Sequence, residues 1–305
     1  MPIKQQGTAI VVALFVLALI AAASIAMIER LQLTMRRTEL LLNDEQANLA
    51  AQGSVAWALT VLSQNLKEKQ PNKIIDPTPI ETTTQVNHIR IKNSLYDAEG
   101  YFNINNVIEK EYQLGLIKLL QTVVPTMTGE QAKAITDAVI DWLSPAINTP
   151  FDRYYSTLTP GYHSAHMSMS SPSELRLIKG VTPAIFQAVI PYLIALPEVT
   201  PININHASIP VLMTLSPTMT AETATQVAKV SKQTPFSSIA LFRDLDVMKH
   251  HTISEKMMTV ESHYFLLKTQ VMIGDQQRTF YTLLRRSIKH SQPEINVVWQ
   301  SKETF

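Results

Sequence analysis

An uncharged, apolar run near the start of the chain is the feature that most limits what this sequence can form. The run extends from Thr8 to Ile28, and neither glycine nor proline interrupts it. At the α-helical rise it would span about 31 Å, the thickness of one hydrocarbon core. We therefore expect residues 8–28 to form a transmembrane helix. Positive charges flank the run on both sides, so they give no orientation.

The segment that precedes the run ends in glycine. A secretory signal is normally cleaved after its apolar stretch, whereas a processing point between Gly7 and Thr8 would lie before it, so the mature protein would keep the helix. The alternative is an ordinary cleavable signal, with three alanines (residues 21–23) before Ser24.

A helical stripe of apolar residues continues beyond the run and argues against a cleavable signal. It extends to about residue 70, where Pro71 would stop it. A periodic helix of about 60 residues without internal caps is typical of a coiled coil, a bundle or a filament core. The stripe consists of Ile25, Ile28, Leu31, Met35, Leu42, Leu49, Ala56, Leu59, Leu62 and Leu66.

Composition excludes several classes of function. Charged residues make up 17% of the chain and the net charge is +1, so no signature of polyanion binding is present. The chain has no cysteine, which excludes thiol catalysis, iron–sulfur clusters, cysteine-ligated zinc and disulfides. Hydrophobic residues at 46% are compatible with a large core.

Beyond Pro71 the pattern changes three times. A proline-rich linker (71–82) precedes alternating residues that predict a strand over 84–93, a turn at 96–100 and a second short strand. Residues from Asn105 to about His250 follow a helical period. Strands are predicted again at 264–273, 278–288 and 295–299. This order predicts an α+β fold with an all-helical domain inserted in a small sheet.

Capping patterns mark the helices of the inserted block. Thr128 and Gln131 predict a capping box, as do Ser171 and Glu174. A helix is expected from Thr182–Pro183 through Leu196, and another after Thr220. Residues 144–170 are expected to form a long irregular loop. Two Asn-Ile-Asn segments (103–105 and 203–205) are interpreted as helix caps in preference to a ligand clamp.

The search for a catalytic or nucleic-acid site yields only weak candidates. His163 and His166 lack a third metal ligand nearby. A membrane-anchored periplasmic hydrolase is kept as an alternative, although no nucleophile motif or phosphate-binding loop is found. Residues 202–230 are similar to a helix-hairpin-helix module of DNA-uptake minor pilins, but their hairpin (216–220) contains no glycine and few basic residues flank it, so we expect no nucleic-acid binding.

Several segments together resemble protein K of the general (type II) secretion pathway, the family of large minor pseudopilins. The resemblance covers essentially the whole chain in order. It rests on the leader ending in Gly7 with its apolar helix, Gly100-Tyr-Phe-Asn-Ile-Asn-Asn106, Asp141-Trp142-Leu143, Tyr154-Tyr155, Ser173-Glu-Leu-Arg-Leu-Ile-Lys-Gly180, Pro201-Ile-Asn-Ile-Asn205 and Leu283-Leu-Arg-Arg286.

The resemblance implies a type IV pilin-like fold, with a long N-terminal helix packed on a small antiparallel sheet and a large helical insertion. It implies cleavage after Gly7 by the prepilin peptidase, N-methylation of Thr8, and a single-pass inner-membrane protein with a periplasmic C-terminal domain. It also implies a structural, non-enzymatic role at the pseudopilus tip, with minor pseudopilins I, J and H and major pseudopilin G as partners.

The expected domains follow from this resemblance. They are a prepilin leader (1–7), a transmembrane helix (8–28), the first part of the pilin-like domain (29–104), the inserted α-domain (105–250) and the C-terminal strands (251–305). The part of the long helix beyond the membrane carries five charged residues, which either contact partner subunits or lie on a face exposed to solvent. The sequence favours neither alternative for Arg36, Arg37, Glu39, Asp44 and Glu45.

One position favours a tip location. In ordinary pilins the fifth mature residue is a glutamate that neutralises the neighbouring N-terminal amine, whereas the fifth residue from Thr8 is Val12. A carboxylate in hydrocarbon is costly without such a partner. The first subunit of a filament has no preceding amine, so Val12 suits a tip subunit. Considered alone, Val12 is simply an apolar membrane residue.

The chain departs from its relatives at the loop after Asp141. Relatives often have an acidic stretch there, and some bind calcium, which requires six to eight oxygen ligands. Here only Asp141 and Asp152 supply carboxylates, so we expect no cofactor, and calcium stays open. Asp97 and Glu99 are a second oxygen pair, expected to be solvated in a turn. The loop's aromatic residues are expected to hold it on its own domain in preference to forming a contact surface for cargo.

Overall fold

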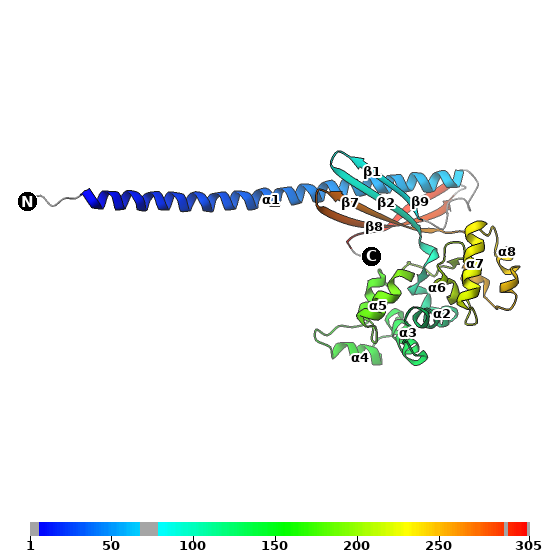
Figure 1. Cartoon of the computed structure of the whole chain (residues 1–305). Helices are drawn as coiled ribbons and strands as arrows, with labels where there is room; N and C mark the ends of the chain where they lie inside the picture. The colour runs from blue at the N-terminus through cyan, green and yellow to red at the C-terminus, as the bar shows by residue number, and fades with distance from the viewer. Residues whose placement is uncertain (1–5, 68–78, 290–291, 304–305) are drawn as a thin grey trace, which may run out of the picture. The chain divides into compact units, whose positions relative to one another are not determined.

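The computed structural model describes residues 6–67, 79–289 and 292–303. Two compact units are distinguished, Met1–Gln52 and Gly53–Phe305. Helix α1 (Gln6–Lys67, 62 residues) contains most of the first unit and extends into the second. The predicted long N-terminal helix is therefore confirmed as one unbroken element (Figure 1).

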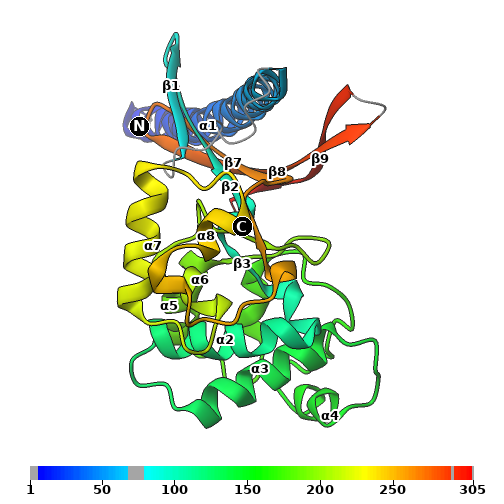
Figure 2. The same cartoon turned by 90° about the vertical axis from the view of Figure 1, so that its right-hand side faces the viewer.

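The second unit contains a five-stranded antiparallel sheet in the order β1-β2-β7-β8-β9. Strands β2 and β7 are hydrogen-bonded neighbours, although the chain between them forms the whole helical domain. The predicted insertion of helices into an antiparallel sheet is thus confirmed (Figure 2). The strands are β1 (Ile80–Val86), β2 (Ile89–Asp97), β7 (Tyr264–Ile273), β8 (Gln276–Lys289) and β9 (Gln292–Lys302).

Helical elements and two short parallel strand pairs fill the interval 98–263, within which the predicted boundaries at residues 105 and 250 lie. The α-helices are α2 (Lys110–Val123), α3 (Gly129–Leu143), α4 (Pro150–Ser156), α5 (Pro183–Val189), α6 (Ile209–Leu212), α7 (Ala221–Gln233) and α8 (Ile239–Arg243). The 3-10 segments are η2 (Ala98–Gly100), η3 (Ile104–Ile108), η4 (Pro172–Leu177), η5 (Ile190–Tyr192), η6 (Met213–Leu215), η7 (Asp246–Met248) and η8 (Glu255–Met257). The short strands are β3 (Phe102–Asn103), β4 (Leu193–Ile194), β5 (Ile202–Asn203) and β6 (Met258–Thr259), which pair β3 with β4 and β5 with β6.

Each face of the sheet has its own apolar layer. On one face Ala58 and Leu62 of α1 pack against Leu95, Phe265 and Leu284. On the other face Ile194 and Leu196 of the helical domain pack against Tyr264, Leu266 and Leu283. The alternation of side chains along β7 and β8 therefore determines which residues bind the helix and which bind the insertion.

Two expectations about the first strands are wrong. The alternation over 84–93 is interrupted by a two-residue turn at Asn87–His88, so it belongs to a β1–β2 hairpin and not to one strand. Asn87 has φ 55°, a left-handed conformation that asparagine tolerates. β2 then continues to Asp97, beyond the predicted start of the turn at residue 96, and η2 forms the turn itself.

The helix expected from Thr182 through Leu196 also ends early. α5 stops at Val189, and Leu193–Ile194 form strand β4. Pro191 explains this ending, because proline removes a helical donor and clashes with the preceding turn. The expected loop 144–170 likewise contains α4, whose Thr149 cap and Pro150 at the first position begin a short helix.

The remaining local signals are confirmed. Thr128 and Gln131 form the predicted reciprocal capping box of α3. Ser171 and Glu174 form another, although it begins a 3-10 helix. Thr220 caps α7. Strand β7 has the predicted bounds, and the turn at Gly274–Asp275 follows it.

Candidate functional site

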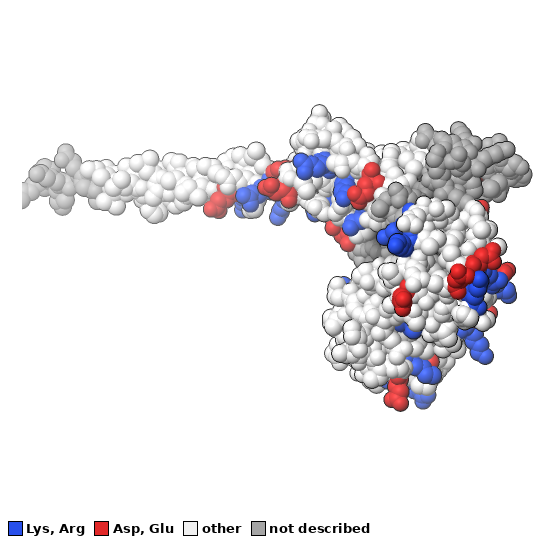
Figure 3. Space-filling model, turned by 45° about the vertical axis from the view of Figure 1, so that its right-hand side comes forward, with Lys and Arg blue, Asp and Glu red and all other residues white. Residues whose placement is uncertain are grey.

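The N-terminal part of α1 is a candidate membrane anchor. It contains a stretch long and apolar enough to cross a bilayer. Figure 3 shows its N-terminal part without charged side chains on the visible face. Val12 is 60% exposed. Gly7 and Thr8 lie within α1, while leader residues 1–5 lie outside the described residues.

The second candidate is a buried polar cluster where the sheet meets the helical domain. One oxygen of Asp97, Oδ2, accepts three hydrogen bonds: from Asn203 Nδ2 at 2.9 Å, Ser262 Oγ at 2.7 Å and His206 Nδ1 at 2.6 Å. The other oxygen accepts from the backbone N–H of Glu99 at 2.8 Å. Asp97 therefore joins β2 to segments far away in the sequence.

Glu99 is buried beside Asp97 in this cluster. Its Oε1 accepts the backbone N–H groups of His263 at 2.9 Å and Tyr264 at 3.2 Å. Burial, with a smaller effect from the charge of Asp97, raises the pKa of Glu99 to about 8. The side chain is therefore mostly protonated at neutral pH. The expectation that Asp97 and Glu99 are a solvated pair is wrong, since both are buried.

Arg286 of β8 completes the cluster. Its Nη2 donates to the carbonyl of Ser262 at 2.6 Å, and its guanidinium lies over the ring of Phe265. Burial lowers the pKa of Arg286, an effect that the neighbouring carboxylates oppose. The buried atoms Glu99 Oε2 and Arg286 Nη1 have no hydrogen-bond partner among the described residues. A bridging water is the usual way that such groups are satisfied.

This cluster does not have the arrangement of a hydrolase. A nucleophile needs a hydrogen bond to its base. Here Ser262 Oγ and His206 Nδ1 both bind the same carboxylate oxygen of Asp97. The geometry therefore supports a structural joint between two parts of the fold.

The two Asn-Ile-Asn segments have a larger role than capping. Asn103 and Asn203 accept the predicted N–H bonds, from Asn105 and Asn205 respectively. In addition, Asn105 exchanges hydrogen bonds with both the N–H and the carbonyl of Met169, and Asn205 does the same with Phe236. The side-chain amides of Asn105 and Asn205 thus each donate to and accept from one distant backbone residue, as the main chain of a neighbouring strand would.

The loop carboxylates bind protein donors. Asp152 Oδ1 accepts from the Ser164 N–H and lies 3.1 Å from His166 Nε2. Asp141 Oδ2 accepts from the hydroxyls of Thr149 at 3.0 Å and Ser164 at 3.2 Å. Across the part of the chain that the structure describes, no three His, Asp or Glu side chains gather as metal ligands. His163 is exposed.

The aromatic residues of the loop pack on their own domain, as expected. Tyr155 is fully buried and stacks on Tyr162 with ring centroids 5.1 Å apart. Trp142 meets Tyr155 edge to face, and Phe151 packs against the same core. Tyr154 stays partly exposed beneath the ammonium group of Lys179.

Sequence reasoning missed the connection among Asp97, His206 and Ser262. Only the Asn-Ile-Asn repeat pointed to this region. The charged residues of the long helix are solvent-accessible: Arg36, Arg37, Glu39 and Glu45 are exposed, and Asp44 is half-buried.

Comparison with known proteins gives a consistent result. A family profile described as type II secretion system (T2SS), protein K matches residues 100–198. Type II secretion system protein K of Pectobacterium carotovorum is 26% identical, over 93% of this chain and 93% of that protein. Protein K of Pseudomonas aeruginosa is 26% identical, over 92% and 89% respectively.

A solved structure has the same fold. A chain in the crystal structure of the GspK–GspI–GspJ complex from the type 2 secretion system of enterotoxigenic Escherichia coli superposes with a TM-score of 0.71. The match covers 88% of this chain and 100% of that chain, at 18% sequence identity.

Proposed function

This chain belongs to the type II secretion system protein K family of minor pseudopilins, and we propose that it stands at the tip of the pseudopilus, where it helps to initiate and cap the filament. One observation carries the proposal most directly. A single helix, α1, begins in an apolar stretch and ends on an antiparallel sheet in which a helical domain separates the neighbouring strands β2 and β7.

The location follows from α1. Its apolar part would anchor the protein in the bacterial inner membrane, with the sheet and the helical domain in the periplasm. The prepilin peptidase would cleave between Gly7 and Thr8, and Thr8 would then be N-methylated. The resulting protein would keep α1 as its anchor.

Partners are proposed on the same basis. The related structure is a complex with GspI and GspJ, so we expect the corresponding pseudopilins I and J to bind this chain, with H and the major pseudopilin G following in the filament. We propose a structural rather than an enzymatic role. The buried cluster is compatible with this role, since Ser262 and His206 both bind one oxygen of Asp97.

Two features favour the tip. Val12 stands where a filament subunit would pair a carboxylate with its neighbour's amine, and the first subunit has no such neighbour. The bulk of the inserted domain would also hinder a further copy from stacking above it. A subunit above which no further copy can stack is suited to cap the filament.

Immunogold labelling of pseudopili assembled with this protein tests the position. We expect label at one end only, and label along the shaft would overturn the tip assignment. Intact-mass analysis of the protein from its host tests the processing: a methylated start at Thr8 is expected, whereas a start at Ser24 would indicate an ordinary signal peptide.

A further inference from the structure

The outer strand β9 contains an irregularity that changes which face its residues occupy. Leu284 pairs with Val297, whereas the preceding Leu283 pairs with Trp299, so Val298 is an extra residue in the ladder. An extra residue of this kind, a β-bulge, redirects the side chains that follow it. Without it, Ile295 and Trp299 would share one face, because they are four positions apart.

The contacts agree with this redirection. Ile295 packs with the cluster on the α1 side of the sheet, and Trp299 packs with the cluster on the side of the helical domain. The bulge therefore brings an indole ring to the space between β9 and the helical domain.

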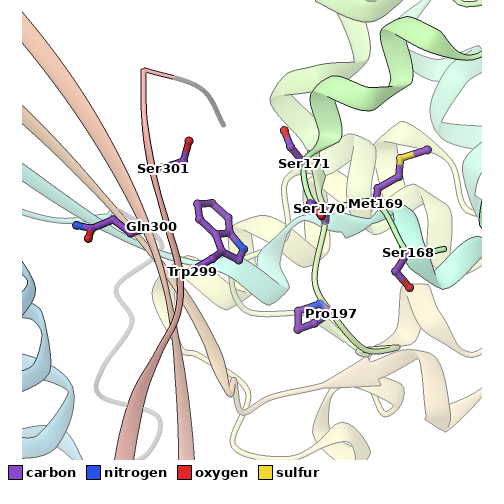
Figure 4. A pocket seen from close by; sticks show the side chains of 9 residues that line it. Ser168, Met169, Ser170, Ser171, Pro197, Trp299, Gln300 and Ser301 are labelled. Atoms are coloured by element: carbon purple, nitrogen blue, oxygen red, sulfur yellow. The ribbon is translucent and has the colours of Figure 1, made fainter. Parts of the chain in front are cut away.

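Trp299 lines a pocket of about 430 Å³ there (Figure 4). The opposite wall comes from the segments 168–171 and 195–197 of the helical domain, with Met169 and Pro197 among its apolar residues.

The chemistry of this lining selects an uncharged occupant. None of the described residues that line the pocket carries a formal charge, so a charged group there would lose water without gaining a counter-ion from them. Among the described residues, the hydroxyls of Ser168 and Ser301 have no hydrogen-bond partner. Apolar walls with a few polar groups are typical of a site for an apolar side chain.

The pocket also reaches the backbone of β9. Three consecutive residues, Trp299 to Ser301, line it, although successive side chains of a strand point to opposite faces. Figure 4 shows Gln300 pointing away from Trp299. Gln300 therefore lines the pocket with its main chain and not with its side chain. β9 is an outer strand of the sheet, and Val297 and Val298 along it are 47% and 38% exposed.

We propose that β9 and this pocket bind an extended, uncharged segment of a partner polypeptide, which adds to the sheet as a further strand and places one apolar side chain against Trp299. An outer strand presents a row of backbone donors and acceptors that an extended peptide can satisfy, while an adjacent pocket selects the side chain. The inference rests on the fold and the pocket, not on the position of the protein in a filament.

The test is isothermal titration calorimetry of the full-length protein in detergent with designed peptides. The first is a blocked heptapeptide of alternating threonine and glutamine with a central phenylalanine. The second has a central aspartate, and the third has N-methyl groups on alternate residues, which remove the backbone donors of one edge. We expect binding of the first and at least tenfold weaker binding of the other two.

Variants identify the site. Trp299→Ala should weaken binding of the phenylalanine peptide at least tenfold, and Trp299→Phe, which keeps an aromatic ring, should weaken it less. Val86→Ser on the opposite outer strand β1 is the control and should leave binding unchanged, because β1 and β9 lie at opposite ends of the sheet. An unaltered unfolding temperature in each variant shows that the fold is retained.

Three outcomes would overturn the proposal. They are the absence of binding by the phenylalanine peptide, equal binding by its N-methylated form, and undiminished binding by a folded Trp299→Ala variant. Binding of a neutral oligosaccharide such as cellohexaose without binding of the peptide would likewise exclude a polypeptide occupant.

Discussion

The imidazole Nδ1 of His206 lies 2.6 Å from Oδ2 of Asp97, and both side chains are almost completely buried. Asp97 ends strand β2, whereas His206 follows the short strand β5 of the inserted domain. This contact therefore joins the sheet to its insertion. Gly100 lies against the same histidine, since an added Cβ there would meet His206 Cβ at 2.9 Å.

Removing the shared acceptor should destabilise the protein strongly. Asp97→Ala removes the acceptor that Asn203, His206 and Ser262 share, and loss of one member of a buried pair costs about 3–5 kcal/mol. Urea unfolding of the full chain in detergent would measure this loss. Lys249→Ala, which removes an exposed pair with Asp246, should change stability by less than about 1 kcal/mol. Similar effects of the two substitutions would contradict a special role for the joint.

Glu99 should make stability fall as pH rises. Its pKa is about 8 in the folded protein, above the ordinary value of 4.5, so the folded state binds this proton more tightly than the unfolded state. The contribution is fully present below pH 4.5 and is lost as pH rises through about 8. Glu99→Gln keeps an oxygen for the N–H groups of His263 and Tyr264, and it cannot ionise.

The free energy of unfolding of the parent protein and of Glu99→Gln would be measured with denaturant at pH 6, 7, 8 and 9. The parent should lose stability relative to Glu99→Gln as pH rises from 6, with most of the loss complete at about pH 8. A constant difference at every pH would show that Glu99 does not titrate in the folded protein.

What could be predicted from the sequence was local. Thr128 and Gln131 specify a helix start by themselves, and the period-2 pattern of β7 specifies its bounds. A turn was missed at Asn87, because asparagine and histidine fit the strand alternation as well as the hairpin. The helix from Thr182 was predicted to continue past Pro191, because the apolar periodicity continues into the residues that form β4.

The polar joint was not predictable by such rules. Asp97 is 109 positions from His206 and 165 from Ser262, and no local pattern connects them. An acidic residue in a turn is normally solvated, so the sequence favoured an exposed Asp97. Only the topology, which makes β2 and β7 neighbours, brings the three residues together.

The bridging asparagines should each stabilise the inserted domain. Asn105→Ala removes hydrogen bonds to Met169 N–H, Met169 O and Leu196 O, and leaves these buried groups unpaired. We expect a loss of at least about 3 kcal/mol, because three groups become unpaired and each unpaired buried group costs about 1–3 kcal/mol. Asn205→Ala removes two bonds to Phe236 and should cost somewhat less.

Thermal or urea unfolding ranks these variants. Gln226→Ala, at an exposed position of α7, is the matched control with an expected change within about 0.5 kcal/mol. Helix capping alone would make both Asn105→Ala and Asn205→Ala nearly neutral, since the capping oxygens belong to Asn103 and Asn203.

Calcium should have little effect on stability, because the loop carboxylates bind protein donors. Asp141 Oδ2 accepts two hydroxyls, and the two oxygens of Asp152 accept the N–H groups of Ser164 and Thr149 while His166 lies beside them. A cation would have to displace these donors and would gain only two carboxylates, fewer anionic oxygens than calcium sites normally provide.

A ligand stabilises a protein in proportion to the logarithm of its concentration over Kd, so millimolar calcium at a tight site would raise the unfolding temperature by several degrees. We expect the unfolding temperatures in millimolar calcium and in excess EDTA to agree within about 1 °C. His166→Ala should lower both temperatures equally, because it removes a partner of Asp152 without creating a ligand. A rise of several degrees with calcium in the parent protein would show that the donors around Asp141 and Asp152 yield to the ion, and that the loop forms a metal site despite its low charge.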